Sequence, residues 1–216
     1  MGVHDPDMQK KGKKKVTYMC IGLEKLSQKT PEDILEQYGD GSCPIDIEGI
    51  LQALGVHFAP MDFVSIERRS PKTVQLRGNI LGAVTLIEDT VNIFYRKGSD
   101  ENTKRFTLAH ELGHCCYDTN LLSDRGHIEW RFDGSTRVLK EVRANLFAGK
   151  ILVPEDMLRA RYHQLCTQSG MTPTSDELGE VFKVDVAVIE ARLKALGFSY
   201  YSLRTPSSAK GAEVID

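Results

Sequence analysis

The sequence predicts an α+β protein that is mostly helical, with a small antiparallel sheet and a helix-turn-helix-like pair of helices near its C-terminus. Several segments carry apolar residues at the i, i+3, i+4, i+7 spacing of a helix. Segments 79–87 and 91–95 instead supply apolar residues at alternating positions, as is typical of strands: Val84, Leu86, Val91, Ile93 and Tyr95. The chain has 216 residues, of which 41% are hydrophobic and 27% charged, so it can bury one substantial core.

Start and stop signals define the first two predicted helices. Thr30 suits an N-cap, Pro31 the first helical position, and Asp33 the acid of a capping box. A second helix is predicted over about 45–54, where the apolar residues share one face, and Gly55 supplies its stop signal.

After Gly55 the spacing of apolar residues changes from that of a helix to that of a strand. Segments 56–59, 79–87 and 91–95 are predicted strands, and residues 88–90 form a hairpin connection between the last two. Segment 118–137 has no clear periodicity and is predicted to be a long loop, a candidate lid or cleft wall. Further helices are predicted over 99–118, over 138–152, from Pro154 onward, over 175–182 and over 185–196.

An H-E-x-x-H motif lies within the predicted helix over 99–118. His110 and His114 are four residues apart, so they share one face with Cβ atoms about 5–6 Å apart. Two imidazoles at that spacing can bind one Zn²⁺, and Glu111 lies beside the metal, where it can act as a general base on water. The alternative is two surface histidines, because the motif arises by chance in about one chain per hundred of this length.

A catalytic zinc site needs a third protein ligand and an open position. The candidates nearby in the sequence are His127, Glu129, Asp133 and Glu141. We favour Glu141, because it lies on a predicted helix with Asn145 one turn later on the same side, where the amide could orient a carboxylate or an imidazole. The alternative is a solvated Glu141 on an amphipathic helix.

These motifs together resemble the ImmA/IrrE family of zinc metallopeptidases, over roughly residues 44–197. One departure is Arg143, where many members carry a second acid. The resemblance rests on Arg105-Phe106-Thr107-Leu108-Ala109, the motif His110 to His114, Glu141, Ala144-Asn145, Phe147-Ala148, Leu152-Val153-Pro154 and the segment from Leu178 to Gly197.

The resemblance implies a zincin-like core with a gluzincin-like site. His110, His114 and Glu141 would bind Zn²⁺, and Glu111 would be the catalytic base. The substrate would be a cognate helix-turn-helix repressor of a mobile element, a prophage or a stress regulon, whose cleavage derepresses genes. The oxyanion needs a further donor, and His127 and Tyr117 are candidates only by their proximity in the sequence.

We expect four parts in the chain: a disordered basic extension over 1–28, the zinc peptidase core over 29–160, a C-terminal helical subdomain over 161–203 and a flexible tail over 204–216. The extension is predicted from its run of lysines between residues 10 and 15.

Composition argues for a cytoplasmic protein without membrane or nucleic-acid partners. The net charge is −2, and the five cysteines show no C-x-x-C spacing, so free thiols are expected. No secretory signal and no apolar run of spanning length is present.

Two non-enzymatic functions remain as alternatives. In one, the protein is a metal-binding adaptor that sequesters a repressor without cutting it. In the other, the C-terminal helix pair binds DNA, although acidic residues outnumber basic ones in that pair, which disfavours contacts with phosphates.

Overall fold

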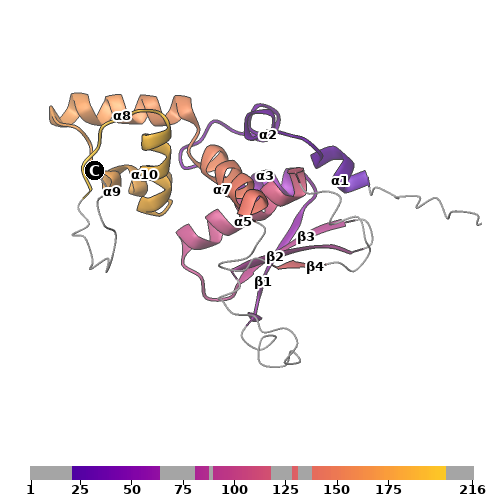
Figure 1. The fold of residues 1–216 in the computed structure, drawn as a ribbon. Helices are drawn as coiled ribbons and strands as arrows, with labels where there is room; N and C mark the ends of the chain where they lie inside the picture. Colours follow the sequence, from indigo (N-terminus) through magenta and orange to yellow (C-terminus); the bar gives the residue numbers. More distant parts are fainter. Residues whose placement is uncertain (1–20, 64–80, 88–89, 118–127, 131–137, 203–216) are drawn as a thin grey trace, which may run out of the picture.

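The structure is a computed structural model that describes residues 21–63, 81–87, 90–117, 128–130 and 138–202 (Figure 1). A sheet lies on one side of a central helix, and further helices cover the other side and extend away from the sheet. The elements are α1 (Ile21–Leu26), α2 (Pro31–Tyr38), α3 (Ile47–Ala53), β1 (His57–Met61), β2 (Gly82–Ile87), β3 (Thr90–Arg96), α5 (Glu101–Tyr117), β4 (Ile128–Trp130), α7 (Val138–Leu152), α8 (Glu155–Ser169), α9 (Ser175–Phe182) and α10 (Val186–Ala195).

The α+β class is confirmed, but the sheet is mixed and not wholly antiparallel. Its strand order is β1-β3-β2-β4, and β2 runs antiparallel to both of its neighbours. The edge strand β1 pairs parallel with β3. A parallel pair needs a long connection, and strand patterns alone do not reveal which strands such a connection brings together.

Segment 118–137 also differs from the predicted loop, because it contains β4. The three residues of β4 pair with β2, and a strand this short is below the length at which alternation can be recognised. The remaining positions of the segment, including any lid, lie outside the described residues.

The predicted capping box of α2 and the predicted glycine stop of α3 are confirmed. In α2 the Thr30 hydroxyl accepts from the Asp33 backbone N–H at 3.1 Å, and the Asp33 carboxylate accepts from the Thr30 N–H at 2.8 Å. Gly55 has a φ of +73°, a left-handed conformation that glycine adopts without strain, and it turns the chain from α3 into β1.

The predicted disordered extension over 1–28 is corrected at its C-terminal end. Residues 21–26 form α1, in which Leu23 and Leu26 are buried, and the Gln28 backbone N–H donates to the Cys116 carbonyl at 2.8 Å. A helix of six residues is too short for its periodicity to be recognised beside a lysine-rich segment. Residues 1–20 and the predicted tail from 204 lie outside the described part of the chain.

Helix α5 lies at the centre of the core. Its residues from Thr107 to Cys116 are all buried, because α7 packs on one side and β2 and β3 on the other. A helix that is buried all round is a core element, so any polar group on α5 needs a partner inside the protein. None of the helices in the described ranges is long and apolar enough to cross a membrane.

Two arginines attach the C-terminal helix pair to this core. The buried Arg105 guanidinium of α5 donates to the carbonyl oxygens of Ile45 at 2.8 Å and Lys183 at 3.1 Å. Arg192 of α10 donates to the carbonyl oxygen of Val153 at 3.1 Å. The predicted boundary at residues 160–161 falls inside α8, where the sequence has no turn signal.

We predict that Arg105→Met lowers the free energy of unfolding by about 2–4 kcal/mol, because both carbonyl groups lose a charged donor. Urea denaturation measures this loss. The control is Arg159→Met, since the Arg159 side chain is 46% exposed and pairs only with Glu155 at 2.6 Å among its described ion pairs. The control should cost less than about 1 kcal/mol, and an equal loss in both variants would contradict the attachment.

We also predict that the adjacent thiols of α5 resist alkylation in the folded protein. Cys115 and Cys116 are buried, and burial raises the pKa of Cys116 to about 12. The reactive thiolate is therefore scarce at pH 8. Iodoacetamide followed by mass spectrometry should label the partly exposed Cys43 and Cys166 before Cys116, and equal labelling of Cys116 without denaturant would contradict the described packing.

Candidate metal centre

Three side chains from α5 and α7 meet at a single point. The Nε2 atoms of His110 and His114 are 3.0 Å apart. The Glu141 carboxylate places Oε2 at 3.3 Å from Nε2 of His110 and Oε1 at 3.5 Å from Nε2 of His114. Both histidines are buried, whereas the Glu141 side chain is 21% exposed. The group is therefore closed towards the core and accessible on the Glu141 side.

The spacing of these atoms suits a tetrahedral metal site. Ligand atoms about 2.0–2.1 Å from a tetrahedral ion lie about 3.3 Å from one another, close to the three distances observed. Two imidazole lone pairs at 3.0 Å repel each other unless a proton or a metal ion lies between them. His110, His114 and Glu141 could thus hold a metal ion, and we call these three residues the metal group. They are the one such group found among the described residues.

Asn145 and Phe106 hold the His110 ring. The Oδ1 atom of Asn145 lies 2.9 Å from Nδ1 of His110. Because an amide oxygen only accepts, this contact suits an Nδ1–H donor, so Nε2 is the nitrogen that faces the other two residues. The Phe106 ring lies one turn earlier on α5, with its centroid 6.2 Å from that of His110.

The histidines also set the charge of Glu141. Burial by itself raises the pKa of this carboxyl, but the hydrogen bonds and charges of His110 and His114 outweigh burial and leave the pKa well below its usual range. Glu141 is therefore an anion, which is the form that coordinates a cation.

Glu111 lies on the sheet side of α5, against the beginning of β2. Its side chain is buried beside Gly82. A Cβ atom at Gly82 would lie 2.5 Å from Oε1 of Glu111 and 2.6 Å from Cγ2 of Thr107. The absence of a side chain at Gly82 thus makes room for the carboxylate. Sequence reasoning missed Gly82, although a glycine within a strand pattern is a known sign of close approach.

The described contacts do not bring Tyr117, another predicted site residue, into this group. Tyr117 ends α5 with its ring edge-on against Phe147, at 5.7 Å between centroids, and with the Arg143 guanidinium 5.9 Å away. Among the contacts described for Tyr117, none reaches the metal group. His127 and Asp133 lie outside the described residues, while Glu129 lies in β4 opposite Val84.

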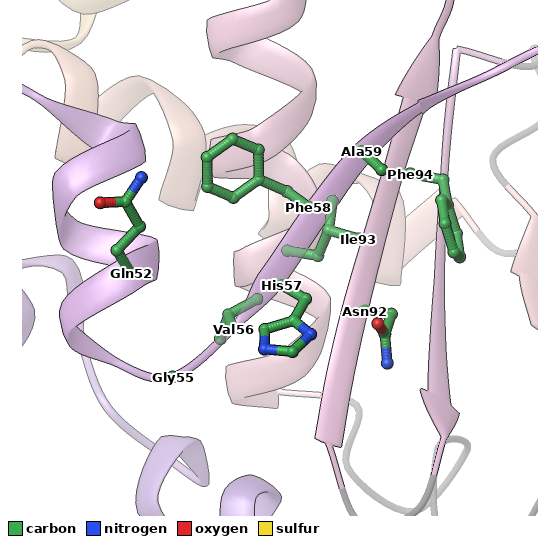
Figure 2. A pocket seen from close by; sticks show the side chains of 9 residues that line it. All are labelled: Gln52, Gly55, Val56, His57, Phe58, Ala59, Asn92, Ile93 and Phe94. Carbon is green, nitrogen blue, oxygen red and sulfur yellow. The ribbon is translucent and has the colours of Figure 1, made fainter.

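A separate cavity of about 610 Å³ lies against α3, β1 and β3 (Figure 2). His57 and Asn92 are register partners on neighbouring strands, and both line it. Its lining contains one imidazole and no carboxylate, so the described residues give it no ligand set comparable to that on α5 and α7.

One solved structure to which the chain is similar is described as a Mycobacterium tuberculosis transcriptional regulator. The likeness has a TM-score of 0.47 at 18% sequence identity and covers 82% of this chain. It covers 46% of that structure, so the chain spans less than half the length of its neighbour. No curated protein matches the chain significantly.

The family comparison covers the whole of the described site. The family model for peptidase M78, described as the IrrE N-terminal-like domain, matches residues 60–194, which is more than half of the chain. The match includes β2, the H-E-x-x-H helix α5, and α7 with Glu141. With the geometry of the metal group beside it, this match shows that the chain belongs to the M78 metallopeptidase family, the family of the IrrE N-terminal-like domain.

Proposed function

We propose that this protein is a zinc-dependent metallo-endopeptidase in which His110, His114 and Glu141 hold the metal and Glu111 is the general base. One observation carries the proposal: the Nε2 atoms of His110 and His114 lie 3.0 Å apart, and each lies 3.3–3.5 Å from a carboxylate oxygen of Glu141. Its support is chemical: two imidazoles and one carboxylate are a ligand set of catalytic zinc sites, which retain one open position.

Zinc bound there supplies Lewis acidity, which makes water a nucleophile near neutral pH and polarises a peptide carbonyl. Glu111 takes the proton of the attacking water and delivers it to the leaving amine. Asn145 keeps the His110 ring in orientation through Nδ1. Tyr117 and His127 remain predictions for the donor to the oxyanion.

We propose a helix-turn-helix transcriptional repressor as the substrate, so that cleavage switches on the genes which the repressor holds silent. The support is the resemblance to the ImmA/IrrE family, whose members act on such repressors. A peptidase working in the cytoplasm needs a narrow specificity of this kind. The cytoplasmic location itself stays a prediction.

An adaptor that sequesters the repressor without cutting it is the second candidate. The buried position of Glu111 beside Gly82 favours cleavage, because burying a carboxylate is costly and sequestration has no use for a base. DNA binding by α9 and α10 is disfavoured by their surface, where Asp176, Glu177, Glu180 and Asp185 line one hollow.

We predict one tightly bound zinc in the wild type, which Glu141→Ala weakens by at least about 100-fold through the loss of a ligand. Glu111→Gln should keep the zinc and lose repressor cleavage by at least about 1,000-fold, because only the base is removed. Metal stoichiometry is measured by mass spectrometry of the native protein. Cleavage is measured on purified helix-turn-helix repressors from the same organism, beginning with any that is encoded beside this chain.

The control is Glu155→Gln, since Glu155 is an exposed carboxylate that pairs with Arg159. This variant should retain both the zinc and the cleavage. A wild type without tight zinc would contradict the metal site, whereas undiminished cleavage by Glu111→Gln would contradict the role of the base. Repressor binding without cleavage would favour the adaptor.

We further predict that Gly82→Ala lowers kcat by about 100-fold with little change in KM or zinc content, since the added methyl group displaces the Glu111 carboxylate. Ala83→Gly is the control, because it perturbs the same strand one residue away. Glu111→Asp should cost less activity in the Gly82→Ala background than in the wild type, because a shorter carboxylate leaves space for the methyl group. Equal costs in the two backgrounds would contradict the steric explanation.

A further inference from the structure

A cavity of about 530 Å³ lies directly beside the candidate metal centre, where α5, α7 and α10 meet. It shares Asn145, the partner of His110, with that centre. Phe106 and Thr107, which also line it, lie on the turn of α5 that precedes His110. A volume of this size is typical of pockets that enclose a ligand.

The α7 wall of this cavity presents apolar side chains to solvent. Leu139, Val142 and Leu146 follow an i, i+3, i+7 pattern on one face of α7, with exposures of 79%, 44% and 59%. Val142 and Leu146 line the cavity, and Leu139 does not. Large apolar side chains gathered at one exposed place often mark a binding surface.

The opposite wall is formed by α10 and consists of small side chains. Ala187, Ala191 and Ala195 recur every fourth residue along α10, and Val188 lies among them. Four-residue spacing places the alanines on one face, so their single methyl groups leave the space in front of α7 open. Helix α10 therefore completes a cavity that α5 and α7 begin.

The charged groups of the lining give the cavity no preference for a charged ligand. Asp185 and Arg192 have opposite charges. The Nε–H of Arg192 already donates to the Val153 carbonyl oxygen. The rest of the lining is apolar except for two threonines and Asn145.

We propose that this cavity is a specificity pocket that receives an apolar side chain of the polypeptide being cut, such as leucine, isoleucine, methionine or phenylalanine. The inference rests on the proposed peptidase function. A peptide bond held at the metal group brings its flanking residues past Asn145 and Phe106, which lie one helical turn from Glu141 and from His110, a rise of about 5.4 Å along each helix axis. An extended chain advances about 3.3 Å per residue, so the apolar side chain lies two or three residues from the scissile bond.

Peptide hydroxamates test the pocket without requiring turnover. The hydroxamate binds zinc, and three residues attached on either side of it present side chains to the surroundings of the metal. Their dissociation constants with the zinc-loaded protein are measured by isothermal titration calorimetry. In one of the two series, serine in place of leucine at the second or third residue should weaken binding by about tenfold or more, as expected for burial of a leucine side chain.

Three variants assign this leucine preference to the pocket. Leu146→Ser should reduce it to less than about threefold, because the apolar wall is lost. Ala191→Phe should abolish it by filling the space from the α10 side. Leu139→Ser is the matched control on the same helix, and it should retain the full preference because Leu139 does not line the cavity. All three positions are exposed, and thermal unfolding verifies that each variant is folded.

The possible outcomes separate the pocket from the peptidase proposal. Zinc-dependent binding with equal affinity for leucine and serine peptides, or a leucine preference that Leu146→Ser and Ala191→Phe leave intact, would overturn the pocket while the proposed function stands. An absence of zinc-dependent hydroxamate binding would overturn the proposed function, and the pocket with it. A preference that is lost in both variants and kept in the control establishes the pocket.

Discussion

The burial of polar side chains on α5 is the constraint on which the rest of the structure depends. His110, Glu111 and His114 lie inside the core, and buried polar groups are costly unless they find partners. Helix α7 supplies partners for the imidazoles, and β2 leaves space for the Glu111 carboxylate. The partners are Glu141 and Asn145, and β2 approaches the carboxylate through a residue without a side chain. The metal group is thus a consequence of how the central helix is packed.

The C-terminal helices have a structural role that their helix-turn-helix-like appearance does not suggest. Arg105 of the core donates to the Lys183 carbonyl oxygen at the end of α9, and Arg192 of α10 donates to the Val153 carbonyl oxygen of the core. Phe182, Ile189 and Leu193 belong to the same buried cluster as α5. A separate DNA-binding module would not need such contacts. In this chain α10 instead forms one side of a cavity next to the metal group.

Local patterns predicted much of the fold and of the site. The spacing of His110 and His114 places both on one helical face wherever the helix lies, and the capping box at Thr30 is a contact within four residues. Glu141 is predicted as a ligand because Asn145 follows it by one turn on a second predicted helix, and the resemblance to a family makes this pattern specific. Such features depend on one or two turns of helix.

The features that the sequence did not reveal depend on contacts between distant segments. Gly82 approaches Glu111 only because β2 packs on α5, and β1 lies parallel to β3 only because a long connection brings them together. The short elements α1 and β4 have too few residues for a period to be recognised. Their positions depend on contacts with α5 and with β2, respectively.

In the proposed pocket, the alanine-rich face of α10 would separate recognition from chemistry. Residues 187, 191 and 195 stand opposite α7 but belong to neither of the helices that carry the metal group. A change of one side chain there would reshape the cavity while the ligand atoms on α5 and α7 keep their places. Single substitutions on α10 would therefore change which polypeptide the proposed pocket accepts, while the proposed metal ligands and the proposed base stay the same.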